Sequence, residues 1–189
     1  MTVFDEAIKL AVSAHSGQTR KTDTTPYILH PMEVAAIVGT MTDDLEVLAA
    51  AVLHDAVEDT SVSVDEIGAK LGDRVAQLVD AETEDKRDGR DPEDTWKERK
   101  EEALNVLSDS SDRDVKILWL GDKLANLSAI HRAWVKDGET VWQKFHQHDP
   151  KEQGWFYRSV ADLLKDELGD TPAWVQYDRL IRIVFEGGV

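Results

Sequence analysis

The chain has 189 residues, of which 41% are hydrophobic and 32% are charged, with a formal net charge of −16 and no cysteine. This length and composition predict a single globular domain over 1–189 and exclude a disordered chain. The acidic balance also excludes non-specific nucleic-acid binding, which needs lysine and arginine, although a local cationic patch would still admit a small anionic substrate.

Other features of the composition indicate where the protein works. No apolar run approaches the roughly 18–20 residues that span a bilayer, and the N-terminal stretch MTVFDEAIKL is acidic where an export signal would be basic. Without cysteine there is no disulfide and no thiolate ligand, so any metal must be held by histidine and carboxylates. We therefore expect a cytoplasmic protein without a membrane partner. Its oligomeric state does not follow from the sequence.

The N-terminal part of the chain has helical periodicity. Apolar residues recur every three or four positions in VFDEAIKLAVSAH, and HPMEVAAIVGTM carries Pro31 where a first helical turn tolerates proline. Asp43 and Asp44 are placed to cap a further helix, which holds the stretch LEVLAAAVLHDAVEDT from Leu45 to Thr60.

The helical pattern continues to the C-terminus. Ser63 and Glu66 form a capping box, and the longest periodic segment runs from about Asp112 to Lys136. Further amphipathic stretches are EDTWKERKEEALNVL, GWFYRSVADLLKDELG and PAWVQYDRLIRIVFEG. No alternating strand pattern is present. The sequence thus predicts an all-α domain, a single helical bundle of about nine or ten helices.

Three polar stretches interrupt this pattern, namely GQTRKTDTTPYILH, DKRDGRDPED and FHQHDPKEQ. The second carries Lys86, Arg87 and Arg90, which we interpret as a charged loop rather than a substrate clamp. The third carries His146 and His148, whose spacing resembles a metal chelate. Because they lie in a polar loop, we favour an ordinary loop over a metal site.

The helix predicted over LEVLAAAVLHDAVEDT is apolar except near its end. There His54 and Asp55 are adjacent, and Glu58 and Asp59 follow one turn later on the same edge. An imidazole beside a carboxylate suits Mn²⁺, Fe²⁺, Zn²⁺ or Mg²⁺. These four residues taken alone would also fit a hydrogen-bonded helix end with two solvated carboxylates.

Two more residues would complete a metal site. His30 precedes Pro31 at a helix start, which is a rigid position for a ligand. Asp122 interrupts the apolar run VKILWLGDKLANL, where a carboxylate is costly unless it is paired or metal-bound. With His54 and Asp55 they supply two nitrogens and two oxygens, which leaves positions open for water and a phosphate oxygen.

The pattern H…HD…D resembles that of the HD-domain metal-dependent phosphohydrolases. AHSGQTRKTDTTPYILHPMEVAAIV resembles the opening of the (p)ppGpp hydrolase domain of the RelA/SpoT homologues, and LHDAVEDT resembles its HD motif with the following Glu-Asp pair. GDKLANL is similar to the segment that supplies the last metal ligand, and WKERK and WFYRSVADLL follow in the family's order. The resemblance covers roughly residues 4–165. It implies a stand-alone small alarmone hydrolase, because the chain ends where larger members begin a synthetase domain.

The resemblance also implies roles for individual residues. One Mn²⁺ would be bound by His30, His54, Asp55 and Asp122. The catalytic pair Glu58 and Asp59 would handle the attacking water and its protons. Substrate would be bound by Arg20, Lys21, Thr22, Tyr27 and Asn126.

The reaction implied is hydrolysis of ppGpp or pppGpp to GDP or GTP and pyrophosphate. Two enzymatic alternatives stay open, a hydrolase of another 3′-phosphorylated nucleotide or of a nucleoside monophosphate. A non-catalytic nucleotide-binding regulatory module is the alternative of another class. The complete ligand set and the Glu-Asp pair favour an enzyme with a small anionic nucleotide as its partner.

Overall fold

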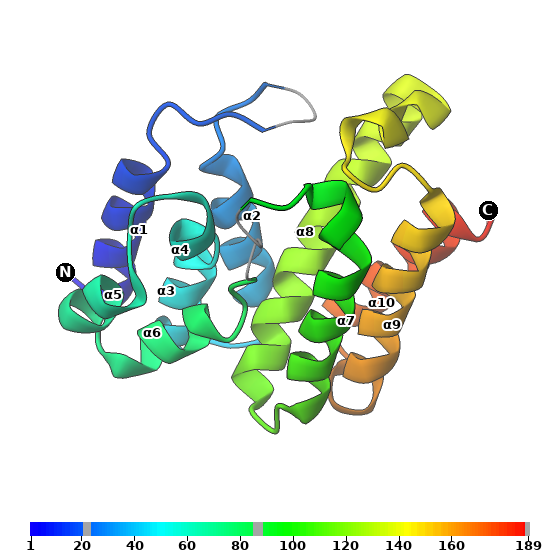
Figure 1. The fold of residues 1–189 in the computed structure, drawn as a ribbon. Helices are drawn as coiled ribbons and strands as arrows, with labels where there is room; N and C mark the ends of the chain where they lie inside the picture. Colours follow the sequence, from blue (N-terminus) through cyan, green and yellow to red (C-terminus); the bar gives the residue numbers. More distant parts are fainter. Residues whose placement is uncertain (21–23, 85–88, 188–189) are drawn as a thin grey trace.

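The computed structural model describes residues 1–20, 24–84 and 89–187 (Figure 1). Within these residues the fold is all-α, as predicted, and the only strand-like feature is an isolated bridge between Thr19 and Pro26. None of the helices in this part of the chain is long and apolar enough to cross a membrane. The helices are α1 (Val3–Ala14), α2 (Leu29–Val38), α3 (Leu45–Leu53), α4 (Ala56–Asp59), α5 (Val64–Leu71), α6 (Asp73–Asp80), α7 (Pro92–Asp109), α8 (Arg113–Asp137), the 3₁₀ helix η1 (Gly138–Lys144), α9 (Pro150–Leu168) and α10 (Pro172–Phe185).

Helix α8 runs through the middle of the molecule (Figure 1). It packs against α2, α3 and α6 on one side and against α9 and α10 on the other. Its contact with α2 is close, because a Cβ atom on Gly121 would lie 2.5 Å from Val38 Cγ2. Since His30 lies in the first turn of α2 and Asp122 lies on α8, the packing of these two helices brings two predicted ligands together.

Helix α3 is the most enclosed short helix of the fold. It packs against α1, α2, α6 and α8, and every residue from Ala49 to Leu53 is buried. Its N-terminus is capped by Asp44, whose carboxylate accepts a hydrogen bond from the backbone N–H of Glu46. The apolar stretch therefore supports the site from the core, as its sequence predicts.

The prediction of one helix over the whole stretch from Leu45 to Thr60 is wrong. Helix α3 ends at Leu53, and α4 starts at Ala56 with Asp55 as its N-cap. Asp55 has φ −90° and ψ −4°, at the edge of the right-handed helical region. The break turns His54 and Asp55 into the interior of the site.

Of the basic loop cluster, Lys86 and Arg87 lie outside the described residues. Arg90 pairs with Glu98 at 3.0 Å on the surface, which agrees with a charged loop.

Candidate metal centre and active site

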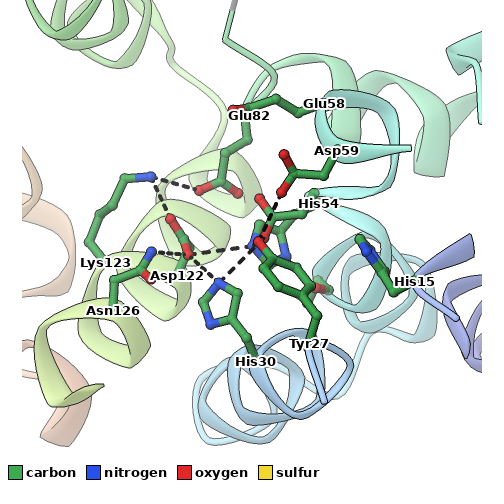
Figure 2. A network of polar contacts seen from close by, with 12 residues as sticks. His15, Tyr27, His30, His54, Glu58, Asp59, Glu82, Asp122, Lys123 and Asn126 are labelled. Carbon is green, nitrogen blue, oxygen red and sulfur yellow. Dashed lines mark hydrogen bonds and ion pairs between the residues drawn. The ribbon is translucent and has the colours of Figure 1, made fainter. Parts of the chain in front are cut away.

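Three predicted ligands, His30, His54 and Asp122, offer ligand atoms that all lie within 4.8 Å of one another, and the fourth, Asp55, contacts both imidazoles from the side (Figure 2). His30 comes from the first turn of α2, His54 and Asp55 from the break after α3, and Asp122 from the middle of α8. Asp122 Oδ1 lies 3.1 Å from His30 Nε2 and 3.4 Å from His54 Nε2. Asp55 Oδ2 lies 3.1 Å from His54 Nε2 and 3.5 Å from His30 Nε2.

These distances fit a divalent metal ion. Ligand atoms about 2.1 Å from a metal lie about 3.0 Å apart along an octahedral edge and about 3.4 Å apart along a tetrahedral one. His54 Nδ1 lies 2.9 Å from the carbonyl oxygen of Ala51, a contact that places the ring proton on Nδ1. His54 Nε2 is buried and makes no hydrogen bond in the described part of the chain, although it faces carboxylate oxygens of Asp55 and Asp122. An orphaned imidazole nitrogen beside two carboxylates is the donor arrangement that a metal ion would satisfy.

The charges of the cluster are strongly coupled. Burial alone would favour the neutral acids, but Lys123 and the two imidazoles hold the pKa of Asp122 well below its usual value. Burial also opposes a charge on His54, yet the carboxylates of Asp55 and Asp122 raise its pKa above the ordinary value. Anionic carboxylates that attract positive charge this strongly are ready to bind a cation.

The carboxylate of Asp122 is held by two neighbours on its own helix. Lys123 Nζ donates to Asp122 Oδ2 at 2.5 Å, and Asn126 Nδ2 donates to Oδ1 at 2.6 Å. Lys123 also lies 3.4 Å from Glu82 Oε1, a buried carboxylate on the segment after α6. Sequence reasoning found Asn126 but missed Glu82 and Lys123. For Lys123 a signal existed, because a lysine next to Asp122 in an apolar run also needs a buried partner.

Tyr27 connects the ligands to the predicted catalytic pair. Its hydroxyl lies 2.6 Å from Asp55 Oδ2 and 3.0 Å from Asp59 Oδ2, so its single proton is shared between the two carboxylates (Figure 2). Burial and the two carboxylates raise the pKa of Tyr27 far above its usual value, so the hydroxyl keeps its proton. The ring packs against His15, with 4.9 Å between centroids. Tyr27 was predicted to bind substrate, but its hydroxyl contacts a predicted metal ligand, Asp55, and a residue of the predicted catalytic pair, Asp59.

The side chains of Glu58 and Asp59 point in different directions. Asp59 points toward Tyr27, while Glu58 extends toward the segment that holds Glu82, where its Oε2 accepts from the backbone N–H of Glu84 at 3.5 Å (Figure 2). Both side chains line the same cavity. The two carboxylates are thus near the ligands but differ in their surroundings.

An open cavity of about 730 Å³ lies over the cluster, a size that suits a nucleotide. His54 and Asp122 are buried beneath it. Arg20 lies at its wall, where its guanidinium donates to Asn126 Oδ1 at 3.2 Å and sits 5.6 Å from the centre of the Tyr27 ring. Lys21 and Thr22 lie outside the described residues. The predicted residues that line the cavity are Arg20, Tyr27, His30, Asp55, Glu58, Asp59 and Asn126.

Among the lining residues that were not predicted as part of the site are Arg99, Phe145 and His146. They come from α7 and from the segment after η1, and all three also line an adjoining hollow of about 260 Å³. His148 Nδ1 instead lies 3.1 Å from the carbonyl oxygen of Trp142. The motif WKERK contains Arg99, so the sequence offered one signal for this wall.

The fold and the His/Asp cluster define the class of the protein. Residues 7–149 match the family described as HD domain, and the chain belongs to this family. Membership implies a divalent metal ion, and it confirms the resemblance on which the expected ligand set was based.

The chain is also similar in sequence to proteins whose names state an activity. The chain is 38% identical over 122 residues to the guanosine-3′,5′-bis(diphosphate) 3′-pyrophosphohydrolase of Vibrio cholerae, which covers 64% of this chain but 17% of that protein. It is 38% identical over 130 residues to the mouse guanosine-3′,5′-bis(diphosphate) 3′-pyrophosphohydrolase MESH1, covering 67% of this chain and 69% of that protein. The chain thus spans a small part of the Vibrio relative and most of MESH1.

Two solved structures are similar over most of the chain. One is a metazoan ortholog of SpoT that hydrolyses ppGpp, with a TM-score of 0.75 and 27% identity, covering 97% of this chain and 96% of that one. The other is a protein of Listeria monocytogenes, with a TM-score of 0.72 and 32% identity, covering 85% of this chain and 96% of that one.

Proposed function

We propose that this protein is a Mn²⁺-dependent phosphohydrolase that converts ppGpp or pppGpp to GDP or GTP and pyrophosphate. The observation that carries the proposal is the convergence of His30, His54, Asp55 and Asp122 beneath a nucleotide-sized cavity. The names of the relatives support the choice of substrate. The net charge of −16 supports a small-molecule partner over a nucleic acid, and a cytoplasmic location stays a prediction.

The proposed metal site takes two nitrogens and two oxygens from the chain. Such a mixed set without sulfur suits Mn²⁺ among the first-row ions. A divalent ion bound there would acidify a water molecule and stabilise negative charge on a phosphoryl oxygen. Replacing Asp55 with alanine should lower the metal content of the purified protein, measured by elemental analysis. Unchanged stoichiometry would exclude Asp55 as a ligand.

The side chains around the cavity supply the remaining chemistry. In the proposed reaction the oxygen of water bonds to the phosphorus attached to O3′, and O3′ leaves with the electron pair of the broken bond. Glu58, which lines the cavity, takes a proton from the water, and Asp59 is held in place by Tyr27. The departing O3′ gains a proton from the site or from solvent, which balances the reaction.

Arg20 and Asn126 are the proposed substrate contacts among the described residues. The guanidinium of Arg20 offers several donors in a planar fork that matches phosphate oxygens. In the structure it donates a hydrogen bond to Asn126 and lies over the ring of Tyr27, so it is held at the wall of the cavity above the predicted metal ligands. Lys21 and Thr22, which follow Arg20 in the sequence, are proposed as further substrate contacts.

A panel of nucleotides tests the proposed function. Purified Mn²⁺-loaded protein is incubated with ppGpp, GTP and AMP, and initial rates are compared with those of Asp55→Ala. We expect rapid loss of ppGpp, little attack on GTP or AMP, and no turnover by the variant. If ppGpp stays intact while AMP is cleaved, the alarmone proposal is wrong and the protein is an HD-domain phosphohydrolase of another specificity.

A further inference from the structure

Glu82 is a buried carboxylate close to Asp122 and Lys123 (Figure 2). It follows α6, with its backbone N–H bonded to the carbonyl oxygen of Val79 at 3.2 Å, and only 7% of the residue is exposed. Figure 2 shows its side chain reaching toward Lys123 and Asp122. A buried carboxylate is costly unless its charge is matched, so its presence beside the ligands calls for an explanation.

The contacts of Glu82 lead directly to a predicted ligand. Glu82 Oε1 lies 3.4 Å from Lys123 Nζ, and the same ammonium donates to Asp122 Oδ2 at 2.5 Å. The other oxygen of Asp122, Oδ1, faces His30 and His54. The ammonium of Lys123 therefore bridges Glu82 and the oxygen of Asp122 that faces away from the histidines.

These contacts of Lys123 have a consequence for metal binding. Without a metal, the ammonium of Lys123 is balanced by Asp122 and by the anionic form of Glu82, whose pKa burial raises to about 7. When a divalent ion binds Oδ1, the negative charge of Asp122 is shared with that ion, and Lys123 lies on the opposite side of the same carboxylate. Glu82 then supplies most of the negative charge that balances Lys123. Without it, two positive charges would compete for one carboxylate in a site where water does not screen them.

We propose that Glu82 is a positioning residue that balances the charge of Lys123 and thereby sets the affinity of the site for a divalent cation. The inference rests on the metal site proposed above, and it adds a group outside the ligand set. Groups around metal ligands change metal affinity by about 10–100-fold when they are removed. A buried ion pair with a merely structural role would change stability without changing affinity.

Mn²⁺ titration of metal-free protein, followed by electron paramagnetic resonance of the unbound ion, tests this directly. Glu82→Gln keeps the shape of the side chain and removes its charge, and we expect the Kd for Mn²⁺ to rise at least tenfold. The matched control is Asp178→Asn. Asp178 is also a buried carboxylate and pairs with Arg158 at 2.6 Å, but it lies on α10, away from the ligands. Its replacement should leave the Kd within threefold of the wild-type value, even if stability falls.

The same substitution in a variant that lacks the Lys123 charge separates the proposed charge balance from other effects of Glu82. In Lys123→Met the cation is gone, so adding Glu82→Gln should change the Kd less than threefold. If Glu82→Gln alone does not fold, the double variant is compared with the wild type, and its Kd should lie within tenfold because both charges of the pair are absent. The inference would be overturned if the double variant loses more than tenfold in Mn²⁺ affinity. It would also be overturned if Glu82→Gln has the same effect on the Kd with and without Lys123, or no effect when Lys123 is present. Absence of Mn²⁺ binding by the wild type would instead overturn the metal site itself.

Discussion

Replacing Gly121 with alanine should damage both the fold and the metal site, because Gly121 is where α8 meets α2. A Cβ atom there would lie 2.5 Å from Val38 Cγ2 and 3.5 Å from Val34 Cγ1. Carbon atoms in favourable contact are about 3.5–4.0 Å apart, so the new methyl group would be about 1–1.5 Å too close to Val38. Val38 is fully buried and β-branched, which leaves it little freedom to rotate away.

The expected magnitude follows from two opposing effects. Alanine is better than glycine in a helix interior by about 1 kcal/mol. Overpacking a core costs about 1–3 kcal/mol, and the upper part of this range applies where a stiff side chain blocks the new atom. We therefore expect a net loss of about 1–2 kcal/mol in the free energy of unfolding. The helices would separate by about 1 Å, a shift comparable with the difference between bonded and non-bonded ligand distances, so Mn²⁺ affinity should fall about tenfold or more.

The assay combines urea unfolding with Mn²⁺ titration, and Val38→Ala provides the rescue. The double variant Gly121→Ala/Val38→Ala removes the clashing Cγ2 and lets the new methyl group occupy part of its space. Its loss of stability should be smaller than the sum of the two single losses by at least about 1 kcal/mol. Unchanged stability and affinity in Gly121→Ala, or strictly additive losses in the double variant, would refute the close-contact reasoning.

Three further outcomes are expected. Glu58→Gln should keep the metal, since no ligand is lost, while kcat falls roughly 10²-fold or more; near-normal turnover would move the proton acceptor elsewhere. Tyr27→Phe should lower the free energy of unfolding by about 1–2 kcal/mol and also reduce kcat, because the donor to Asp59 is lost; a variant equal to the wild type in urea unfolding and kinetics would contradict this. Burial alone would raise the pKa of Glu84, but Lys100 and its other cationic neighbours lower it below 4.5, so its stabilisation is present at neutral pH and is lost as pH falls through the lowered pKa. Urea unfolding of Glu84→Gln should therefore show a deficit of about 1–3 kcal/mol at pH 7 that shrinks as the pH falls below 4.5 and through the lowered pKa, and a deficit independent of pH would exclude the charge as its cause.

The features that the sequence predicts well are those set by local pattern. The 3.6-residue periodicity and the capping residues indicated the helices, and the all-α fold followed from them. The four-residue helix α4 could not be separated from α3, because one turn is too short to show a period of its own. The turn at Asp55, which aims His54 into the site, thus became visible only in the structure.

Contacts between distant residues were the harder part of the site. Asp122 was identifiable because a carboxylate in an apolar run demands a partner, yet the sequence does not say that Lys123 and Glu82, 41 residues apart, supply the surrounding charge. Tyr27 was expected at the substrate, whereas in the structure its hydroxyl joins Asp55 and Asp59. Such pairings depend on how helices pack, which periodicity alone does not determine.

Product identification by ³¹P nuclear magnetic resonance shows which bond of ppGpp is cleaved. Wild-type protein with Mn²⁺ is mixed with ppGpp, and Asp55→Ala is run in parallel. We expect equal amounts of pyrophosphate and GDP from the wild type, and unchanged ppGpp with the variant, because cleavage occurs at the 3′ oxygen and requires the ligand set. Release of inorganic phosphate in place of pyrophosphate, loss of the 5′-diphosphate, or equal turnover by Asp55→Ala would contradict the proposed reaction.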